Sequence, residues 1–205
     1  MWRFLPLAGV VLFAAVGVWW RSWLQRRRYG TRAILLFRST SRGQRLRDGL
    51  AVSLLVLLVG QGIVAAGWPE LLSPLGADQR TTLEIQYAMG AALLFGGIAL
   101  AVVAQLQLGA SWRIGIEEGA SPGLVTGGLY RFCRNPIFLA MLLIVAGYAL
   151  LLPTRLSLAL LVGTYIGIRQ QVAEEEAYLL RTYGDGYRDY ARLVGRFLPG
   201  IGRLG

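Results

Sequence analysis

The sequence predicts an all-α integral membrane protein with about five transmembrane helices. Of its 205 residues, 55 % are hydrophobic and only 16 % are charged, which is not the composition of a soluble domain. The hydrophobic residues are gathered into uncharged blocks, and a helix needs roughly 20 residues to cross about 30 Å of hydrocarbon. Three blocks come close to that length on their own, namely residues 4–20, 49–68 and 85–106.

The first block, residues 4–20, is predicted to be a retained membrane anchor. Its positive charges follow the hydrophobic stretch, and it has no small-x-small cleavage site, whereas a secretory signal has the opposite charge order and such a site. Two shorter blocks, residues 136–152 and 156–168, are separated only by "PTR". Because proline cannot continue a helix, these two blocks are predicted to form a helical hairpin that turns at Pro153.

Charge placement predicts the orientation of the helices. All 21 basic residues are arginine, and nine of them lie in the basic loop 21–48, whereas the connection between the second and third blocks holds only Arg80. The positive-inside rule puts the basic loop in the cytoplasm. With five spans the N-terminus is outside, and the C-terminal tail and the segment before it are cytoplasmic. We expect a multi-pass protein of a bacterial inner membrane.

The composition also excludes several classes of function. The chain has no histidine, which excludes histidine metal sites, histidine general bases and Ser-His-Asp triads, and no metal site is predicted. The net charge of +10 lies beside the hydrophobic blocks and accompanies no nucleic-acid motif. Membrane lipids with anionic headgroups are therefore the expected partners, rather than nucleic acid or an obligate protein partner. Cys133, the single cysteine, is predicted to be a packing residue.

The apolar island "AILLF", residues 33–37, interrupts the basic loop and has two interpretations. It suits a short helix lying in the headgroup region. It is equally compatible with a plain connector whose arginines only fix the topology.

The chain is predicted to divide into an N-terminal membrane part, residues 1–105, and a C-terminal part, residues 106–205. The C-terminal part opens with a glycine-rich segment that shows no long periodic run, and read by itself this segment is a flexible linker. The tail is predicted to continue the last span as a helix to about Arg181, to break at Gly184 and Gly186, and to form one more short helix. Three consecutive glutamates at 174–176 point in three directions, so at least one should face the protein.

The C-terminal part carries a series of motifs in register. "LGASWR" at 108–113 is followed by "RNPIF" at 134–138, and then by the paired Glu175 and Glu176. The other members of the series are Gly128, Tyr130, Leu179, Tyr183, Gly184, Tyr187, Tyr190 and Pro199. In order and spacing the series resembles the isoprenylcysteine carboxyl methyltransferase family of membrane enzymes, which is related to the phospholipid methyltransferases.

The resemblance implies an S-adenosylmethionine-dependent methyltransferase whose acceptor, a carboxylate, amine or thiol, is lipid-like or small and amphipathic. It makes residues 106–205 the catalytic region and places Glu175 at the reaction centre, with Arg134 and Glu176 as further catalytic candidates. It implies that the cofactor binds between the last two spans and the cytoplasmic loops. The implied cofactor contacts are Pro122, Gly123, Leu124, Val125, Tyr130, Asn135, Pro136, Ile137 and Phe138.

The sequence departs from the patterns of related methyltransferases at two of these positions and at Gln171. Asn135 stands in place of a histidine and Phe138 in place of a tyrosine, and both can still bond or stack with the cofactor. Gln171 stands where the eukaryotic carboxyl methyltransferases have an arginine that holds the substrate carboxylate. Gln171 and Arg169 are the candidate contacts to the acceptor, although Arg169 lies about 200° around the helix from Gln171 and does not simply replace the missing arginine.

Two other functions are compatible with parts of the sequence. NADPH-dependent membrane sterol-type reductases have a similar tail with an Arg-x-Pro motif, but the paired glutamates argue against a reductase. A non-enzymatic membrane adaptor that recruits partners through its arginines is the third possibility, and the motif spacing argues against it.

Overall fold

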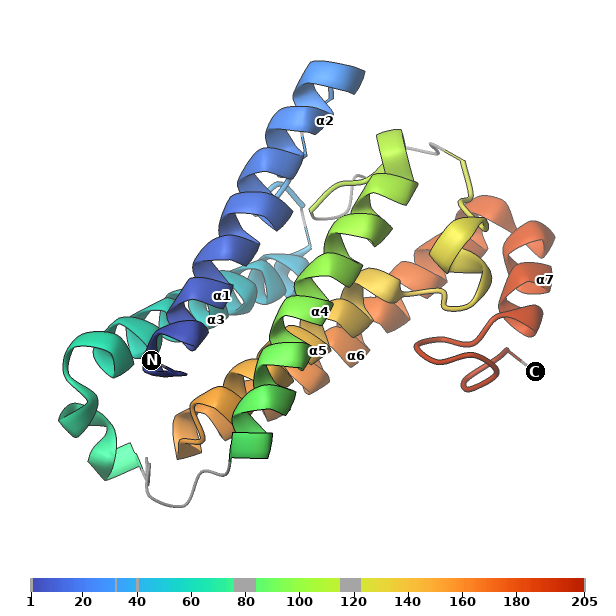
Figure 1. The fold of residues 1–205 in the computed structure, drawn as a ribbon. Helices are drawn as coiled ribbons and strands as arrows, with labels where there is room; N and C mark the ends of the chain where they lie inside the picture. Colours follow the sequence, from blue (N-terminus) through green and yellow to red (C-terminus); the bar gives the residue numbers. More distant parts are fainter. Residues whose placement is uncertain (1, 32, 40, 76–83, 115–122, 205) are drawn as a thin grey trace.

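The fold consists of helices joined by turns and short non-helical segments in the part of the chain that the computed structural model describes, which is residues 2–31, 33–39, 41–75, 84–114 and 123–204. Figure 1 shows the arrangement of its helices. They are α1 (Leu5–Phe13), α2 (Arg21–Tyr29), α3 (Arg42–Gly67), α4 (Glu84–Leu108), α5 (Pro136–Leu151), α6 (Arg155–Tyr183) and α7 (Asp185–Leu193). A π-helical stretch, Ala14–Trp20, joins α1 to α2 in one continuous rod. Short 3-10 turns cover Trp2–Phe4, Pro69–Leu75, Gly109–Ser111 and Gly128–Arg131.

Three of the helical segments are long and apolar enough to cross a membrane. They are Trp2–Tyr29, Arg42–Gly67 and Glu84–Ser111, and they contain nearly all of the three long blocks predicted from the sequence. The apolar α5 is shorter, with 16 residues, and it is followed by α6 after a break at Leu152, Pro153 and Thr154. The predicted hairpin and its turn at Pro153 are therefore confirmed, while the count of five spans stays a prediction.

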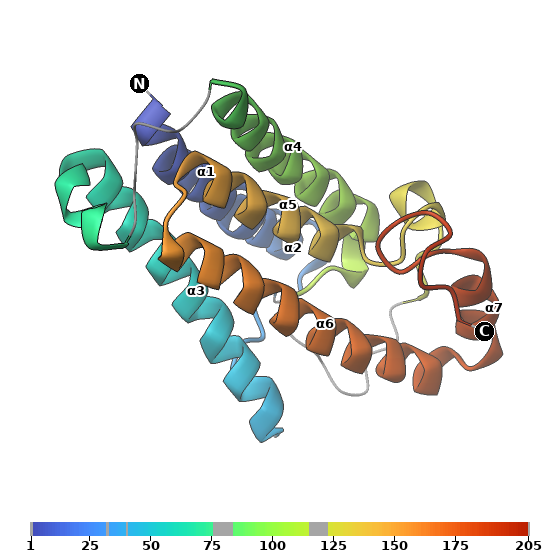
Figure 2. The same ribbon diagram turned by 90° about the horizontal axis from the view of Figure 1, so that it is seen from below.

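The helices α4 and α5 form the most extensive contact in the fold, and Figure 2 shows α5 lying between α4 and α6. Glycines make this approach possible. A Cβ added at Gly147 of α5 would lie 2.4 Å from the Leu94 nitrogen of α4, and one added at Gly97 would lie 3.0 Å from the Ala140 oxygen. Inside a membrane, small residues of this kind let two helix backbones pack closely.

A buried arginine fastens the N-terminal rod to the end of α4. The Arg21 side chain donates to the backbone oxygens of Gln105 and Gly109, at 3.1 and 2.9 Å, and its guanidinium lies 4.5 Å from the ring centre of Trp112. Carbonyl oxygens at the end of a helix carry partial negative charge, which favours a cation there. The carbonyls at the end of α4 therefore compensate a charge that has no ion-pair partner among the described residues.

The helical interpretation of the apolar island 33–37 is wrong, because the backbone around Ile34 is extended and Leu36 and Phe37 form a turn. Ile34 forms an isolated parallel bridge with Ile114. The Leu35 amide donates to the Ile114 oxygen at 2.9 Å, and the Ile114 amide donates to the Ala33 oxygen at 2.7 Å. The segment after α4 thus supplies backbone partners that a short isolated helix would have had to find within itself.

The tail follows its predicted course with one difference. The helix α6 extends to Tyr183, and the chain then turns at Gly184, whose φ of +54° and ψ of −124° are accessible in practice only to glycine. The second predicted break is wrong, because Gly186 lies within α7. One positive-φ glycine is enough to reverse the chain, and the helix can then restart immediately.

Replacing Gly147 with alanine should destabilise the protein by about 1–3 kcal/mol, because the added methyl group would overlap the backbone of α4. Gly163 of α6 is a matched control, since an added Cβ has no atom within 4 Å and alanine there should leave stability unchanged or slightly raise it. Thermal unfolding in detergent can be followed with a thiol-reactive fluorogenic dye, because the single cysteine, Cys133, is buried. Equal melting temperatures for the two variants would contradict this account of the interface.

Candidate functional site

The site is built where the segment before α5 pairs with the C-terminal tail. The Arg134 amide donates to the Gly195 oxygen at 3.0 Å, and the Asn135 amide donates to the Arg196 oxygen at 3.2 Å. Pro136 begins α5 at a position where its missing N–H removes no helical hydrogen bond. Two segments that are about 60 residues apart in sequence are thereby held together at the entrance to α5.

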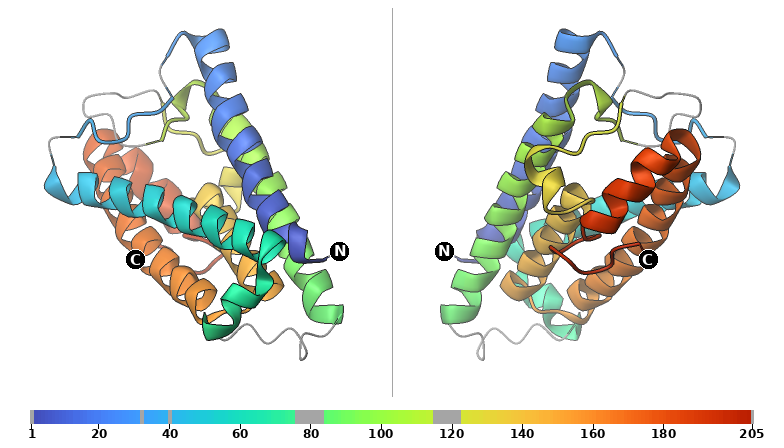
Figure 3. Two further views of the ribbon diagram at one scale, coloured as in Figure 1. Left: turned by 90° about the vertical axis from the view of Figure 1, so that its left-hand side faces the viewer. Right: turned by 90° about the vertical axis from the view of Figure 1, so that its right-hand side faces the viewer.

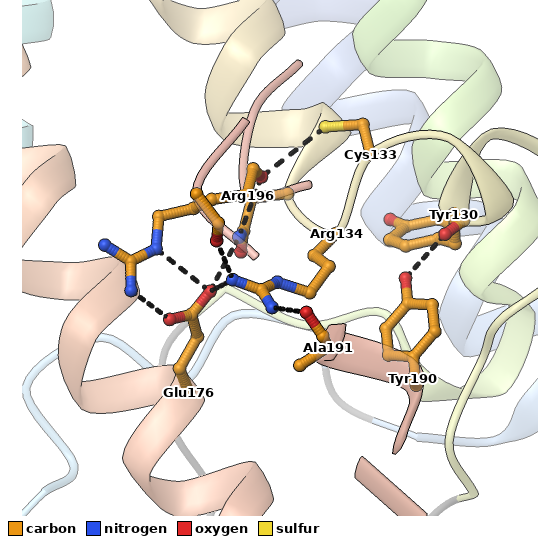
Figure 4. A network of polar contacts seen from close by, with 9 residues as sticks. Tyr130, Cys133, Arg134, Glu176, Tyr190, Ala191 and Arg196 are labelled. Carbon is orange, nitrogen blue, oxygen red and sulfur yellow. Dashed lines mark hydrogen bonds and ion pairs between the residues drawn. The ribbon is translucent and has the colours of Figure 1, made fainter. Parts of the chain in front are cut away.

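An ionic cluster of two arginines and one glutamate forms the centre of the site (Figure 4). The carboxylate of Glu176, on α6, lies 3.0 Å from the Arg134 guanidinium and 2.6 Å from the Arg196 guanidinium. The side chains of Arg134 and Glu176 are almost completely buried, with 1 % and 7 % exposed. Removing such charges from water costs several kcal/mol, so each needs the other and further hydrogen bonds.

Arg134 also binds the tail through its backbone. One terminal nitrogen donates to the Ala191 oxygen at 2.7 Å, and the other donates to the Gly202 oxygen at 2.8 Å. Ala191 lies in the last turn of α7, so the guanidinium also compensates the carbonyl end of that helix. Arg134 therefore connects α5, α6, α7 and the chain terminus through one side chain.

Three tyrosines of the predicted motif surround this cluster. The Tyr190 hydroxyl donates to the Tyr130 backbone oxygen at 2.6 Å, and the Tyr130 hydroxyl donates to the Ala104 oxygen of α4 at 3.4 Å. Tyr187 packs edge-on against Tyr190 with ring centres 6.1 Å apart, and its buried hydroxyl has no hydrogen-bond partner in the described part of the chain. Burial raises the pKa of all three phenols, so they remain neutral hydrogen-bond donors.

Glu175 differs sharply from its neighbour Glu176. No hydrogen bond or ion pair to Glu175 is found among the described residues, and its side chain is only partly exposed. Desolvation, reinforced by the charge of Glu176 and opposed by Arg113, raises the pKa of the Glu175 carboxyl to about 7. Adjacent glutamates therefore have different chemistry, because one is fixed by two arginines and the other can exchange a proton near neutral pH.

The predicted cofactor contacts fall into two groups. Asn135 and Pro136 are buried at the cluster, with the Asn135 side chain donating to the Arg196 oxygen at 3.2 Å, whereas Ile137 and Phe138 are partly exposed on the first turn of α5. Gly123, Leu124 and Val125 lie in a segment that is neither helix nor strand, and Pro122 lies outside the described residues.

The two groups are connected through α6 and α4. The Gly123 amide donates to the Tyr183 hydroxyl at 3.2 Å, which connects the segment of Gly123, Leu124 and Val125 to the end of α6. The Leu129 amide donates to the Gln107 side chain at 2.7 Å, beside Gly128, where an added Cβ would lie 2.5 Å from the same side-chain oxygen. The loop is therefore anchored at both ends, and the linker interpretation does not describe these residues.

The two predicted acceptor contacts, Arg169 and Gln171, lie in different surroundings. Arg169 is exposed, and its guanidinium lies over the ring of Tyr165 on the same helix. Gln171 accepts a hydrogen bond at 3.1 Å from Arg47 of α3, which also forms an ion pair with Glu174. The structure thus places an arginine of the N-terminal part beside Gln171, the residue at which the sequence lacks the arginine of the eukaryotic carboxyl methyltransferases.

Sequence reasoning missed Arg196 and Arg47 as partners of this region. A buried glutamate requires a nearby cation, but the tail contains several arginines, and nothing in their spacing singles out Arg196. Arg47 was assigned to the topology-setting basic loop. Its pairing depends on how α3 crosses α6 (Figure 3), which no local pattern encodes.

The fold and the site together define a polytopic helical membrane protein with a buried polar centre at one end of its bundle. Residues 85–186 match the phospholipid methyltransferase family, and this part of the chain belongs to it. The match confirms the resemblance drawn from the motifs, and the family indicates a membrane methyltransferase. No curated protein is similar enough to the whole chain to count as a match.

The variant Glu176→Gln should lower the free energy of unfolding by about 3–5 kcal/mol, because it leaves buried Arg134 without its counter-charge. The unfolding temperature reported by Cys133 would measure this loss. Asp185→Asn removes an exposed ion pair to Arg188 and should change stability by less than about 1 kcal/mol. A similar small effect for both variants would show that the cluster does not hold the site.

Glu175→Gln should change the pH dependence of stability with a defined sign. A carboxyl whose folded pKa is raised binds its proton more tightly in the folded state, so its favourable contribution is complete below the unfolded pKa of about 4.5 and is lost by about pH 7. As pH rises from 4.5 to 8, the free energy of unfolding of the variant should therefore increase by about 1–3 kcal/mol relative to that of the wild type. Melting curves of both proteins across this range provide the measurement, and parallel curves would refute the shifted pKa.

Proposed function

We propose that the protein is an S-adenosylmethionine-dependent methyltransferase that acts at the membrane on a lipid-like or small amphipathic acceptor. The family match supports methyl transfer. The contrast between Glu176, fixed by two arginines, and Glu175, desolvated with a pKa of about 7, is the observation that carries the proposal. Enzymes place groups of this kind where a proton must move at neutral pH.

The residues at the site fit the chemistry of this cofactor. Its sulfonium is a cation, which a desolvated carboxylate such as Glu175 favours, and its other polar groups need hydrogen-bond donors and acceptors. The buried Arg134 Nε, within the cluster, and the buried Tyr187 hydroxyl, beside it, have no hydrogen-bond partners in the described ranges. Tyr130, Asn135 and the backbone from Gly123 to Val125 would hold the rest of the cofactor.

When bound, the cofactor supplies an electrophilic methyl group for in-line transfer. Among the protein's own groups, Glu175 accepts a proton if the acceptor is an amine, whereas a thiolate or carboxylate acceptor requires no base. Arg134, Glu176 and Arg196 are positioning residues, because their contacts fix α6 and the tail relative to the start of α5. Such positioning contributes to rate by holding reactants in line.

The proposal includes a topology of five spans. The two additional spans would be α5 and the apolar first half of α6. The basic loop, the site and the C-terminal tail then share the cytoplasmic side, as the arginine distribution predicts.

Purified protein in nanodiscs should bind S-adenosylhomocysteine saturably in isothermal titration calorimetry, and NADPH should give no heat of binding. Incubation with methyl-tritiated S-adenosylmethionine and total bacterial membrane lipids should label a lipid-soluble product. With an amine acceptor, Glu175→Gln should slow labelling by about 100-fold or more. The same variant should change the dissociation constant of S-adenosylhomocysteine by less than about threefold. Arg188→Gln, an exposed change on α7, serves as the control.

Absence of S-adenosylhomocysteine binding would overturn the proposed function. Binding of NADPH in its place would favour a reductase. Absence of both, in a protein that melts cooperatively, would favour a non-enzymatic adaptor.

A further inference from the structure

A second polar site lies between α3 and α6, on a different face of α6 from the ionic cluster. It is a hollow of about 230 Å³. Its walls are formed by Ser39, Ser41, Gln44, Glu174, Ala177, Tyr178 and Arg181. The α6 members are spaced three, one and three residues apart, so they form a single stripe along that helix. The hollow is smaller than the roughly 300–1,000 Å³ of sites that enclose a drug-sized ligand, which suits a headgroup rather than a whole cofactor.

The walls carry groups that bind anionic oxygens. Arg181 contributes an exposed guanidinium, and Ser39 and Ser41 contribute hydroxyls. Ser41 is the N-cap of the 26-residue helix α3, so the positive end of that helix dipole faces the same hollow. Arginine and helix N-termini are both common ligands of phosphate.

Among the described wall residues Glu174 is the one acidic group, and an arginine that does not line the hollow neutralises it. Arg47 forms an ion pair with Glu174 and donates to the Gln44 side chain at 2.9 Å. It therefore binds two of the wall residues without lining the hollow itself. The nearby Asp48 does not line the hollow, and its oxygens accept from the Phe37 amide and the Gln44 side chain. Arg181 and the N-terminus of α3 therefore make the described walls of the hollow electrostatically positive.

The position of the hollow relates it to the bilayer. Arg42, where α3 begins, lies seven residues before the hydrophobic block 49–68, and Glu174 lies beyond the block 156–168. Both walls thus lie on the parts of α3 and α6 that project beyond the hydrophobic blocks, on the side of the polar headgroups rather than in the hydrocarbon. Basic pockets between helices on this side of a membrane bind acidic lipid headgroups.

We propose that this hollow binds the phosphate of an anionic lipid headgroup, with Arg181 as the direct ligand and Arg47 as a positioning residue that neutralises Glu174. This inference goes beyond the proposed function, and its test requires no methyl donor. A failure here therefore leaves the cofactor assay unaffected, and the reverse also holds.

The test is equilibrium binding of tritiated lysophosphatidic acid to the full-length protein in dodecyl maltoside micelles, measured by scintillation proximity. Arg181→Gln and Arg47→Gln should each weaken binding about tenfold. Arg45→Gln is the matched control, because Arg45 is an exposed arginine in the first turns of α3 that does not line the hollow, and it should bind as the wild type does. The double variant Arg47→Gln/Glu174→Gln should recover binding to within about threefold, since removing the carboxylate removes the need for its partner.

Recovery in the double variant separates an electrostatic role of Arg47 from a purely structural one, which a second mutation would not repair. Excess unlabelled lysophosphatidic acid should displace the label, whereas monooleoylglycerol and inorganic phosphate at the same concentration should not. Equal losses in the Arg45 and Arg181 variants would overturn the proposal in favour of diffuse surface charge. Full displacement by inorganic phosphate would overturn the assignment to a lipid.

Discussion

The site depends on the ion pair between Arg134 and Glu176. Arg134 stands at the entrance to α5, Glu176 lies on α6, and the same guanidinium holds the carbonyl end of α7 and the backbone at Gly202. Since both side chains are buried, neither charge can be satisfied by water if the other is removed. The closeness of the tail to the hairpin is therefore a requirement of charge compensation, and the tyrosines and Asn135 take their positions from it.

The N-terminal part of the chain is joined to the C-terminal part, which begins at residue 106, at three separate places. Arg21 compensates the end of α4, the segment at Ile34 pairs with Ile114, and Arg47 reaches Gln171 and Glu174 on α6. All three contacts lie near the segments that the methyltransferase motifs occupy. The basic loop thus has a structural role in addition to setting topology, because its arginines supply cations to helix ends and carboxylates that would otherwise lack them.

The neighbouring glutamates illustrate how a helix separates two functions. Successive residues on α6 differ in direction by about 100°, so Glu174, Glu175 and Glu176 meet three different surroundings. Glu176 meets two arginines, Glu174 meets Arg47 at a partly solvated surface, and Glu175 meets a desolvated environment that raises its pKa to about 7. A run of identical residues therefore supplies an anchor, a wall of a headgroup hollow and a titratable group.

The sequence by itself determined the helical membrane class, the three long spans, the hairpin at Pro153 and the methyltransferase family, because hydrophobic block length, proline placement and motif spacing are local properties of the chain. It also selected Glu175, Glu176, Arg134 and Asn135 as a set. Only the tertiary structure decided which of these side chains is fixed and which is free to titrate, since that depends on Arg196 and on the path of the tail. It likewise placed Arg47 beside Gln171 and turned the apolar island at Ile34 into an extended pairing segment. These contacts join residues that are 20 to 124 positions apart, and charge compensation and backbone pairing at such separations arise only once the helices have packed.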